Sequence, residues 1–266
     1  MAVETPETSK INSDTAAEFA LPTPEAKHEY VRTMFDAIAP RYDLLNSVFS
    51  ARMHHHWRRV AVAQTALSPG DAALDVCTGT GDLAFELARC VGKSGSVIGS
   101  DFSAPMLSLA EKKRENSAGL SQTRFTLADT MALPFSDNTF DAVTVGFGIR
   151  NVSDIQTGLR EMVRVLRPGG RAVILEFSQP QNPVLALLYR WYSFTLLPFI
   201  GGLISGRRSA YQYLPSSVAA FYSRQELSGL LSEAGLAEVG IRELAFGAVV
   251  VHRGTKPLCV GNGKRA

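Results

Sequence analysis

The sequence predicts a doubly wound α/β fold: a mostly parallel seven-stranded sheet that ends in a C-terminal antiparallel hairpin and carries an N-terminal helical cap. Three observations predict it. From about residue 72 onward, short apolar runs alternate with amphipathic segments, which is the pattern of consecutive βαβ units. A glycine loop directly follows the first apolar run, where such sheets bind ligands. The 266 residues, 45% of them hydrophobic, can bury a sizeable core.

The expected strands are runs of β-branched or other apolar residues bounded by Gly, Asp or Pro. Five of them alternate with helical segments, at 72–77, 96–100, 124–128, 141–147 and 171–177. Two further runs, at 239–244 and 246–254, are separated only by a short turn. This spacing predicts the antiparallel hairpin at the end of the sheet.

Helical spacing of apolar residues fills the segments between these strands. We expect helices over 83–92, 103–117, 153–170 and 223–236, the third of which ends in a Pro-Gly-Gly run. Upstream, residues 28–67 predict two cap helices that are broken at Pro40.

Capping residues support three of these helices. Ser103 is a candidate N-cap of the second, and Ser153 or Asp154 of the third. Ser223 and Glu226 have the spacing of a capping box and open the fourth.

Charge and cysteine usage exclude several classes of protein. Lys+Arg 27 against Asp+Glu 25 gives a net charge of +2, which is too balanced to indicate a nucleic-acid partner. The three cysteines are widely spaced, so neither a disulfide framework nor a cysteine zinc site is expected. This usage favours a reducing cytoplasm.

The domain layout follows from composition. Residues 1–26 lack the apolar core of a signal peptide, and their acidic residues disfavour a transit peptide, so we expect a disordered tail. A single domain, 27–257, follows, and 258–266 form a second tail. We divide it into a helical cap, a cofactor-binding core, a lid or substrate region, and a C-terminal helix with strands, at 27–67, 68–178, 179–222 and 223–257.

The apolar stretch 185–206 has transmembrane length. Arg190 lies inside it, and Pro198, Gly201 and Gly202 interrupt it, so we do not expect a helix that spans a membrane. A buried lid, or a surface that touches lipid, fits this composition better.

The glycine loop has two interpretations. Gly79 and Gly81 lie between a strand and a helix, where the backbone can approach a ligand and the helix N-terminus offers free N–H groups. With Ala84 they match the dinucleotide pattern, and Asp101 lies at the position of a ribose-binding carboxylate. On this feature alone, an NAD-dependent oxidoreductase remains open.

Other features favour S-adenosylmethionine. Asp75 precedes the glycines as D-x-x-x-G-x-G, the first methyltransferase motif, and Asp129 follows the third strand, where methyltransferases hold the adenine amino group. The strand around 141–147 and the RVLRPGGR turn follow in the expected order. The ordered set makes a methyl donor the favoured ligand.

Two segments resemble the signatures of the quinone-biosynthesis C-methyltransferase family. The stretch YDLLNSVFSARMHHHW matches the first signature through Tyr42, Asp43, Asn46, Ser50, His54 and Trp57. The stretch RVLRPGGRAVILEFS matches the second through Arg164, Pro168, Gly169, Gly170, Glu176 and Ser178. The resemblance covers roughly residues 29–257.

The resemblance implies a Rossmann-like class I fold and methyl transfer from S-adenosylmethionine to a ring carbon of a polyprenyl quinol. Demethylmenaquinol is the first choice of substrate, and 2-methoxy-6-polyprenyl-1,4-benzoquinol is the alternative. Gly146 departs from some members, which carry serine there, and is not counted as a site residue. With the motif residues, the expected cofactor contacts are Asp75, Gly79, Thr80, Gly81, Asp101, Asp129 and Thr130.

Three residues are expected to act on the substrate. Arg150 follows the fourth strand at the ligand-binding edge of the sheet. A guanidinium is a poor base, so it would lower the pKa of the quinol hydroxyl or orient a water molecule that takes the proton. The alternative is an arginine that only pairs with a nearby carboxylate. Tyr42 and Asn46 could hydrogen-bond the quinol oxygens, or Tyr42 could simply be packed.

The run of three histidines does not have the geometry of a metal site. Consecutive residues of a helix point about 100° apart, so His54, His55 and His56 cannot all face one ion, and no metal is expected. His54 and Trp57 lie one turn apart on a shared face and are expected to pack the cap over the cofactor cleft.

Several expectations remain open at this point. We expect a polyprenyl quinol as the substrate. We also expect residues 185–206 to make peripheral contact with the inner face of the cytoplasmic membrane. The oligomeric state is open, and a homodimer is one candidate. An NAD-dependent small-molecule reductase and a non-enzymatic S-adenosylmethionine sensor are the alternatives from other classes. Binding of S-adenosylhomocysteine but not of NAD would exclude the first, and methylation of a quinol would exclude the second.

Overall fold

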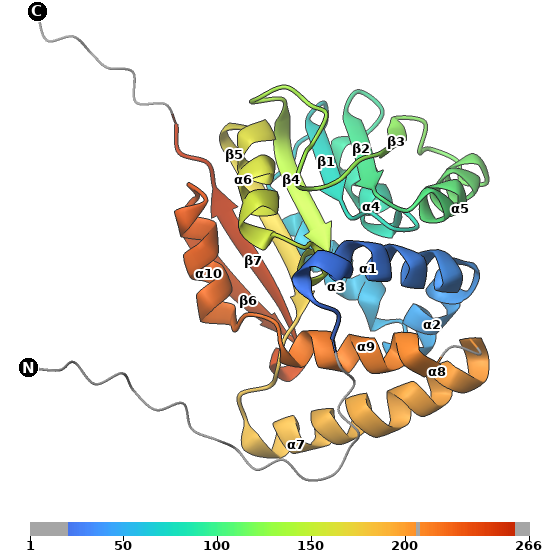
Figure 1. The fold of residues 1–266 in the computed structure, drawn as a ribbon. Helices are drawn as coiled ribbons and strands as arrows, with labels where there is room; N and C mark the ends of the chain where they lie inside the picture. Colours follow the sequence, from blue (N-terminus) through green and yellow to red (C-terminus); the bar gives the residue numbers. More distant parts are fainter. Residues whose placement is uncertain (1–20, 206–207, 259–266) are drawn as a thin grey trace, which may run out of the picture.

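The computed structural model describes residues 21–205 and 208–258. Its centre is one seven-stranded sheet in the order β3-β2-β1-β4-β5-β7-β6 (Figure 1). The strands are β1 Ala72–Val76, β2 Ser96–Asp101, β3 Thr123–Leu127, β4 Phe140–Gly146, β5 Leu166–Phe177, β6 Ala237–Leu244 and β7 Val249–Thr255. The first five are parallel, and β7 pairs antiparallel with both β5 and β6. The predicted fold class is confirmed, including the C-terminal hairpin.

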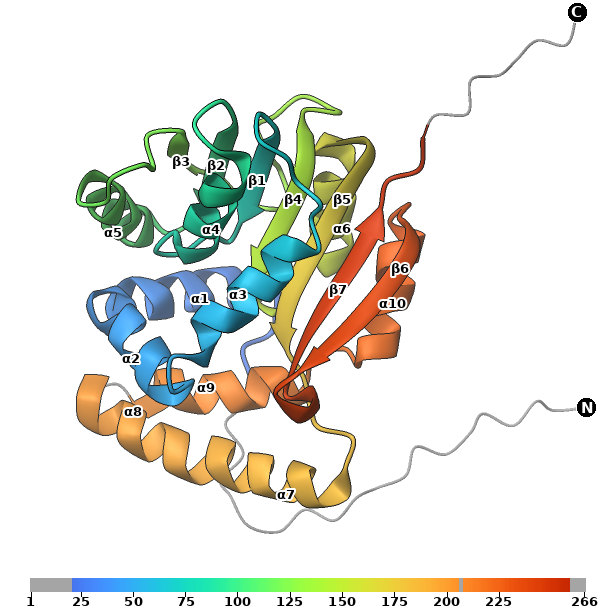
Figure 2. The same ribbon diagram turned by 180° about the vertical axis from the view of Figure 1, so that it is seen from behind.

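Helices cover both faces of the sheet. The core helices are α4 Asp82–Val91, α5 Ala104–Glu115, α6 Ile155–Val165 and α10 Arg224–Glu233. One face packs α4 against β1 and β2, with Leu87, Ala88 and Val97 fully or almost fully buried. The other face packs α6 and α10 against β4, β5 and β7, as the two opposite views show (Figures 1 and 2).

The predicted helix N-caps are confirmed, and the structure decides between the two candidates at α6. Ser103 accepts a hydrogen bond from Met106 N–H, and Ser223 forms the capping box with Glu226. At α6 it is Asp154, not Ser153, whose carboxylate accepts from Thr157 N–H. The Pro-Gly-Gly run does not belong to α6, because β5 already begins at Leu166.

The N-terminal cap contains three α-helices instead of the predicted two: α1 Pro24–Ile38, α2 Tyr42–Phe49 and α3 Met53–Ala63. Pro40 breaks the chain as expected, within the short helix η1 Ala39–Arg41. The second break occurs at Ala51 and Arg52, which have positive φ angles of 46° and 64°. Neither is a glycine, so the sequence carries no local signal for this left-handed turn.

The predicted N-terminal tail, 1–26, overlaps the first helix of the structure. Residues 1–20 of the predicted tail 1–26, and 259–266 of the second tail, lie outside the described residues. The helix α1 already begins at Pro24, because Thr23 accepts a hydrogen bond from Ala26 N–H and Pro24 occupies the first helical position.

The lid is formed by α7 Pro183–Trp191, the π-helical turn η3 Tyr192–Leu196, α8 Leu197–Ser205 and α9 Arg208–Ala219. The first three form one long rod that α9 runs beside (Figures 1 and 2). Residues Pro183–Leu203 are long and apolar enough to cross a membrane, with 22% of the most apolar window buried. The rod nevertheless packs on the domain, since the Tyr192 hydroxyl donates to the Phe49 carbonyl at 2.7 Å.

Candidate active site

Two cavities adjoin at the carboxyl edge of the sheet. The first, the loop cavity, is lined among others by His28, Phe35, Tyr42, Cys77, Gly79, Asp101, Asp129, Met131, Phe147 and Asn151. The second, the apolar cavity, has a volume of about 250 Å³ and is lined among others by Phe35, Tyr42, Asn46, His54, Trp57, Phe147, Arg150, Phe177, Tyr192, Tyr211 and Tyr213. Phe35, Tyr42 and Phe147 line both, so one group of side chains separates the two spaces.

The glycine loop turns sharply from β1 into α4. Gly79 and Gly81 have φ angles of 57° and 84°, and Gly81 is the N-cap of α4. A Cβ on Gly81 would lie 2.8 Å from the Phe125 ring, so only glycine fits this turn. The Gly79 N–H donates to the Asp101 carboxylate at 2.8 Å, which joins the loop to the end of β2.

Asp75 lies behind the loop and not on the wall of the loop cavity. Its two carboxylate oxygens accept hydrogen bonds from Thr78 Oγ1 at 2.6 Å and Thr144 Oγ1 at 2.7 Å. Only 1% of its surface is exposed, and this burial raises its pKa to about 7. The structure therefore places Asp75 as an organiser of the loop conformation.

Asp101 and Asp129 both line the loop cavity. Asp101 accepts from Gly79 N–H and from Ser103 N–H at 2.9 Å, and burial raises its pKa to about 6. Asp129 accepts from Met131 N–H at 2.9 Å and lies 3.7 Å from His28 Nε2. Backbone hydrogen bonds thus orient both carboxylates at the edge of the cavity.

The remaining predicted cofactor contacts lie behind the wall. Thr80 donates to Asp43 Oδ1 at 2.6 Å and accepts from Lys113 Nζ at 3.1 Å, which fastens α2 to the loop. The Thr130 hydroxyl lies 3.3 Å from the Cys77 sulfur. Of the seven predicted cofactor contacts, the wall of the loop cavity includes Gly79, Asp101 and Asp129, and it excludes Asp75, Thr80, Gly81 and Thr130.

Helix α1 supplies wall residues that the sequence analysis did not identify. The wall of the loop cavity includes His28, Val31 and Phe35 of this helix. Met106 and Asn151 also line it. Val31 and Phe35 are four residues apart, so helical spacing would have placed them on one face. Nothing in that spacing says which cavity the face covers.

The loop cavity has the chemistry that an adenosyl methyl donor requires. Two oriented carboxylates can accept hydrogen bonds from hydroxyl and amino groups, and a glycine backbone lets a ligand approach closely. Phe102, Met131 and Val152 offer apolar surface for a flat ring. The residues present therefore fit S-adenosylmethionine.

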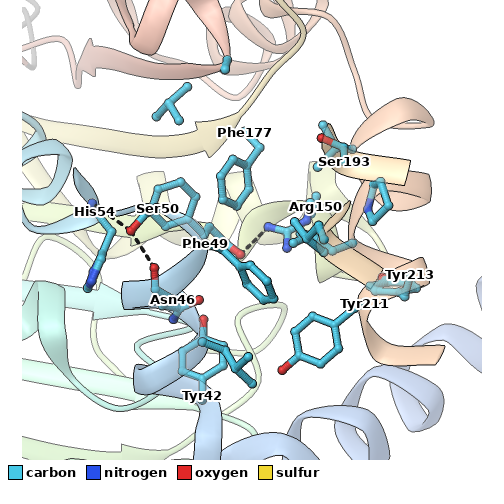
Figure 3. A pocket seen from close by; sticks show the side chains of 18 of the residues that line it. Tyr42, Asn46, Phe49, Ser50, His54, Arg150, Phe177, Ser193, Tyr211 and Tyr213 are labelled. Atoms are coloured by element: carbon cyan, nitrogen blue, oxygen red, sulfur yellow. Dashed lines mark hydrogen bonds between the residues drawn. The ribbon is translucent and has the colours of Figure 1, made fainter. Parts of the chain in front are cut away.

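The apolar cavity is enclosed by the cap, the lid and the sheet edge. Its polar groups are few, and Figure 3 shows Arg150 on one side of the space and Tyr42 and Asn46 on another. Burial raises the pKa of the Tyr42 phenol, with a hydrogen bond to Asn46 acting in the opposite direction. Tyr42 is therefore a neutral group that can donate a hydrogen bond. All three predicted substrate residues line this one cavity.

Arg150 is held by a buried ion pair. Its Nη1 donates to Glu176 Oε1 at 2.8 Å and to the Phe147 carbonyl at 2.5 Å, and its Nε donates to Ser217 Oγ at 3.4 Å. The Arg150 and Glu176 side chains are 6% and 0% exposed. The pairing that the sequence left as an alternative is thus present. Within residues 21–205 and 208–258, Nη2 makes no hydrogen bond, so the fork retains a donor beside the cavity.

The histidine run divides as its helical spacing predicts. His54 and Trp57 are buried and line the apolar cavity, whereas His56 is exposed. Desolvation, together with Arg58, lowers the pKa of His54 to about 4, so the ring is neutral. Arg58 also pairs with Asp82 at 3.3 Å, which links the cap to the first residue of α4.

The family model described as the ubiE/COQ5 methyltransferase family matches residues 23–256. The chain belongs to this family. Membership confirms the family expected from the two signatures, and S-adenosylmethionine is the methyl donor. The alternative of an NAD-dependent reductase has no support here.

Relatives cover nearly the whole domain. A Geobacter sulfurreducens protein named ubiquinone/menaquinone biosynthesis C-methyltransferase UbiE is 45% identical over 232 residues, 87% of this chain and 90% of the relative. A Lactiplantibacillus plantarum protein named demethylmenaquinone methyltransferase is 42% identical over 226 residues, 85% and 95% of the two chains.

Solved structures share the fold at lower identity. A SAM-dependent methyltransferase from Aquifex aeolicus matches with a TM-score of 0.58 at 20% identity, over 80% of this chain and 97% of that one. The [4+2]-cyclase SpnF matches with a TM-score of 0.64 at 17% identity, over 87% and 96%. Because a cyclase shares the architecture, the fold alone does not specify the reaction of this family member.

Proposed function

We propose that this protein methylates a ring carbon of a polyprenyl quinol, with demethylmenaquinol as the first substrate and 2-methoxy-6-polyprenyl-1,4-benzoquinol as the second. One observation carries the proposal: a largely apolar cavity adjoins the loop cavity and shares Phe35, Tyr42 and Phe147 with it. The names of the relatives support a quinone product and include both quinone classes.

The bound donor supplies a methyl group on a sulfonium, which a nucleophilic ring carbon takes while the electron pair of the broken bond stays on sulfur. The chain must hold the ring against the shared wall and exclude water from both cavities. Such positioning is worth up to about 7–11 kcal/mol of the barrier. Phe35 and Phe147 supply the apolar part of this wall, and Tyr42 its hydroxyl.

Arg150 is suited to stabilise the phenolate form of the substrate. Loss of the hydroxyl proton raises the electron density at the adjacent ring carbon, and a nearby guanidinium lowers the pKa of that hydroxyl. Glu176 neutralises part of the Arg150 charge, but it also fixes the orientation of the fork. After the carbon–methyl bond forms, the ring regains aromaticity by releasing its hydrogen as a proton.

A paired assay tests the substrate. Purified protein and S-adenosylmethionine carrying a labelled methyl group are incubated with demethylmenaquinol and with the benzoquinol, and label in each product is counted. We expect transfer to both rings, with the higher kcat/KM for the naphthoquinol. A higher value for the benzoquinol would reverse the order of substrates.

Calorimetry is the companion experiment. The proposal requires S-adenosylhomocysteine to bind and NAD to leave the heat signal unchanged. Binding of S-adenosylhomocysteine without methylation of either quinol would contradict the proposed substrate and favour the non-enzymatic sensor.

A further inference from the structure

The long rod of the lid has an apolar face that the other described residues of the chain do not cover. Its members lie in α7, η3 and α8 and are between 43% and 73% exposed. We call this the outer face, and it consists of Val184, Leu187, Leu188, Trp191, Phe194, Phe199 and Leu203. So many large exposed side chains on one rod make a continuous apolar surface of the kind that marks an interaction site.

The spacing of these residues is that of one helical stripe. Val184, Leu187, Leu188 and Trp191 follow the i, i+3, i+4, i+7 pattern. The opposite side of the same rod is already used, because Tyr189, Tyr192, Ser193 and Leu197 line the apolar cavity. A soluble helix would keep polar residues on the side away from the core. This rod is apolar on both sides.

The charge of the segment indicates what covers the outer face. Residues 177–223 contain no Asp or Glu, and their only charged side chains are Arg190, Arg207 and Arg208. The segment therefore carries +3, while the whole chain carries +2. Among the described side chains of the rod, Arg190 is exposed beside the outer face. An apolar stripe flanked by arginine fits an anionic lipid surface.

We propose that the outer face docks the protein on an anionic bilayer, with the rod lying in the plane of the membrane. A rod that crossed the bilayer would have to leave the domain, yet it forms one wall of the apolar cavity and is tied to α2 through Tyr192 and Phe49. The apolar side chains enter the boundary between headgroups and acyl chains. Trp191 lies at the headgroup level, where amphipathic rings concentrate.

This orientation brings the apolar cavity next to lipid. A helix with its side chains is about 10–12 Å across, so the bilayer and the cavity would lie one helix apart. For the proposed quinol, whose polyprenyl tail dissolves in the membrane, that distance lets the ring enter while the tail stays in lipid. This reason rests on the proposed function, but the docking itself is measured without any quinol.

Vesicle flotation with the full chain tests the proposal. The vesicles are phosphatidylcholine alone or phosphatidylcholine with phosphatidylglycerol, in the absence of quinol. We expect flotation with the anionic vesicles, weaker flotation with the neutral ones, and weakening by salt. The double variant Leu187→Glu/Trp191→Glu should reduce the fraction bound to anionic vesicles about tenfold or more.

The matched control is Leu127→Glu. Leu127 is 62% exposed at the end of β3. The strand β3 lies far from the rod in both views (Figures 1 and 2), so this exchange should leave flotation unchanged. The conservative exchange Trp191→Leu should retain most of the binding. Binding of S-adenosylhomocysteine by each variant shows that the domain is folded.

Two results would overturn the proposal. One is equal flotation of the wild type and the double variant. The other is no flotation of the wild type together with sedimentation showing a dimer that the double variant dissociates, which would assign the outer face to a second copy of the chain. Failure to methylate quinols would leave either reading of the flotation data intact, since no quinol is present.

Discussion

The two cavities of this molecule are built in opposite ways. The loop cavity comes mainly from a contiguous part of the chain, residues 77–153, together with one face of α1. The apolar cavity comes from segments as distant as Met34 and Val249, brought together by the cap and the lid. In the first, main-chain N–H groups orient carboxylates; in the second, aromatic packing encloses one buried ion pair.

This difference separates two kinds of vulnerability. Burial raises the pKa of two carboxyl groups beside the glycine loop, that of Asp75 to about 7 and that of Asp101 to about 6. The apolar cavity depends on its volume and on the Arg150–Glu176 ion pair, which water does not reach. Its variants should therefore act through packing and unpaired charge.

The largest effect is expected from Glu176→Ala, which would break the ion pair with Arg150 beside the apolar cavity. Arg150 would be left as a buried, uncompensated cation, which costs about 3–5 kcal/mol of unfolding free energy. Urea denaturation measures this loss. The control is Arg89→Ala, which removes the exposed partner of the Arg89–Glu86 pair and should cost at most about 1 kcal/mol. Similar losses in the two variants would contradict the contrast between buried and exposed pairs.

Arg150→Lys sharpens the comparison by changing activity and leaving cofactor binding intact. Lysine keeps the charge but cannot reach Glu176, Phe147 and Ser217 with one planar fork. Loss of a positioned donor costs about 10²–10³ in kcat. Methyl transfer and S-adenosylhomocysteine affinity are measured on the same preparation. Full turnover in this variant would disprove the role of Arg150.

Substitutions at two helix glycines test whether the space beside the apolar cavity is tightly packed. A Cβ on Gly201 of α8 would lie 2.3 Å from the Tyr211 ring, which lines the apolar cavity, whereas a Cβ on Gly229 of α10 meets nothing within 4 Å. We expect Gly201→Ala to cost about 1–3 kcal/mol and to raise the KM for quinol. Gly229→Ala should stabilise by up to about 1 kcal/mol through helix propensity. Thermal unfolding gives the sign in each case.

The same contrast explains how much could be predicted from the sequence. The strands, the glycine loop and the placement of Asp101 and Asp129 follow from local periodicity and from motifs that lie close together in the chain. Thr80 and Asp75 belong to the same motif, yet their side chains turn to Asp43, Thr78 and Thr144. A motif locates the loop, but it does not say which side chains face the ligand.

The apolar half was predictable only in part. The resemblance pointed to Tyr42 and Asn46, and the place of Arg150 after the fourth strand pointed to that arginine; all three line one cavity. The break at Ala51 and Arg52, and the wall formed by α1, depend on packing between segments that are distant in the sequence. No local pattern encodes such contacts, because any apolar helix face could have been buried against a different partner.

The smallest effect is expected from Asp75→Asn, and it appears only as a change in pH dependence. The pKa of Asp75 is raised to about 7 by burial, so between its ordinary pKa and about pH 7 the folded state holds a proton that the unfolded chain has lost. This contribution to stability is complete below about pH 4 and is lost as the pH rises through 7. Asparagine does not titrate, so the stability difference between wild type and variant should fall as the pH rises from about 4 to 8. The control Asp154→Asn should change the slope in the opposite sense, because hydrogen bonds from Thr157 lower the pKa of Asp154. Parallel stability–pH profiles for wild type and Asp75→Asn would mean that no titrating carboxyl at Asp75 holds the glycine loop. The contrast between the loop cavity and the apolar cavity would then fail.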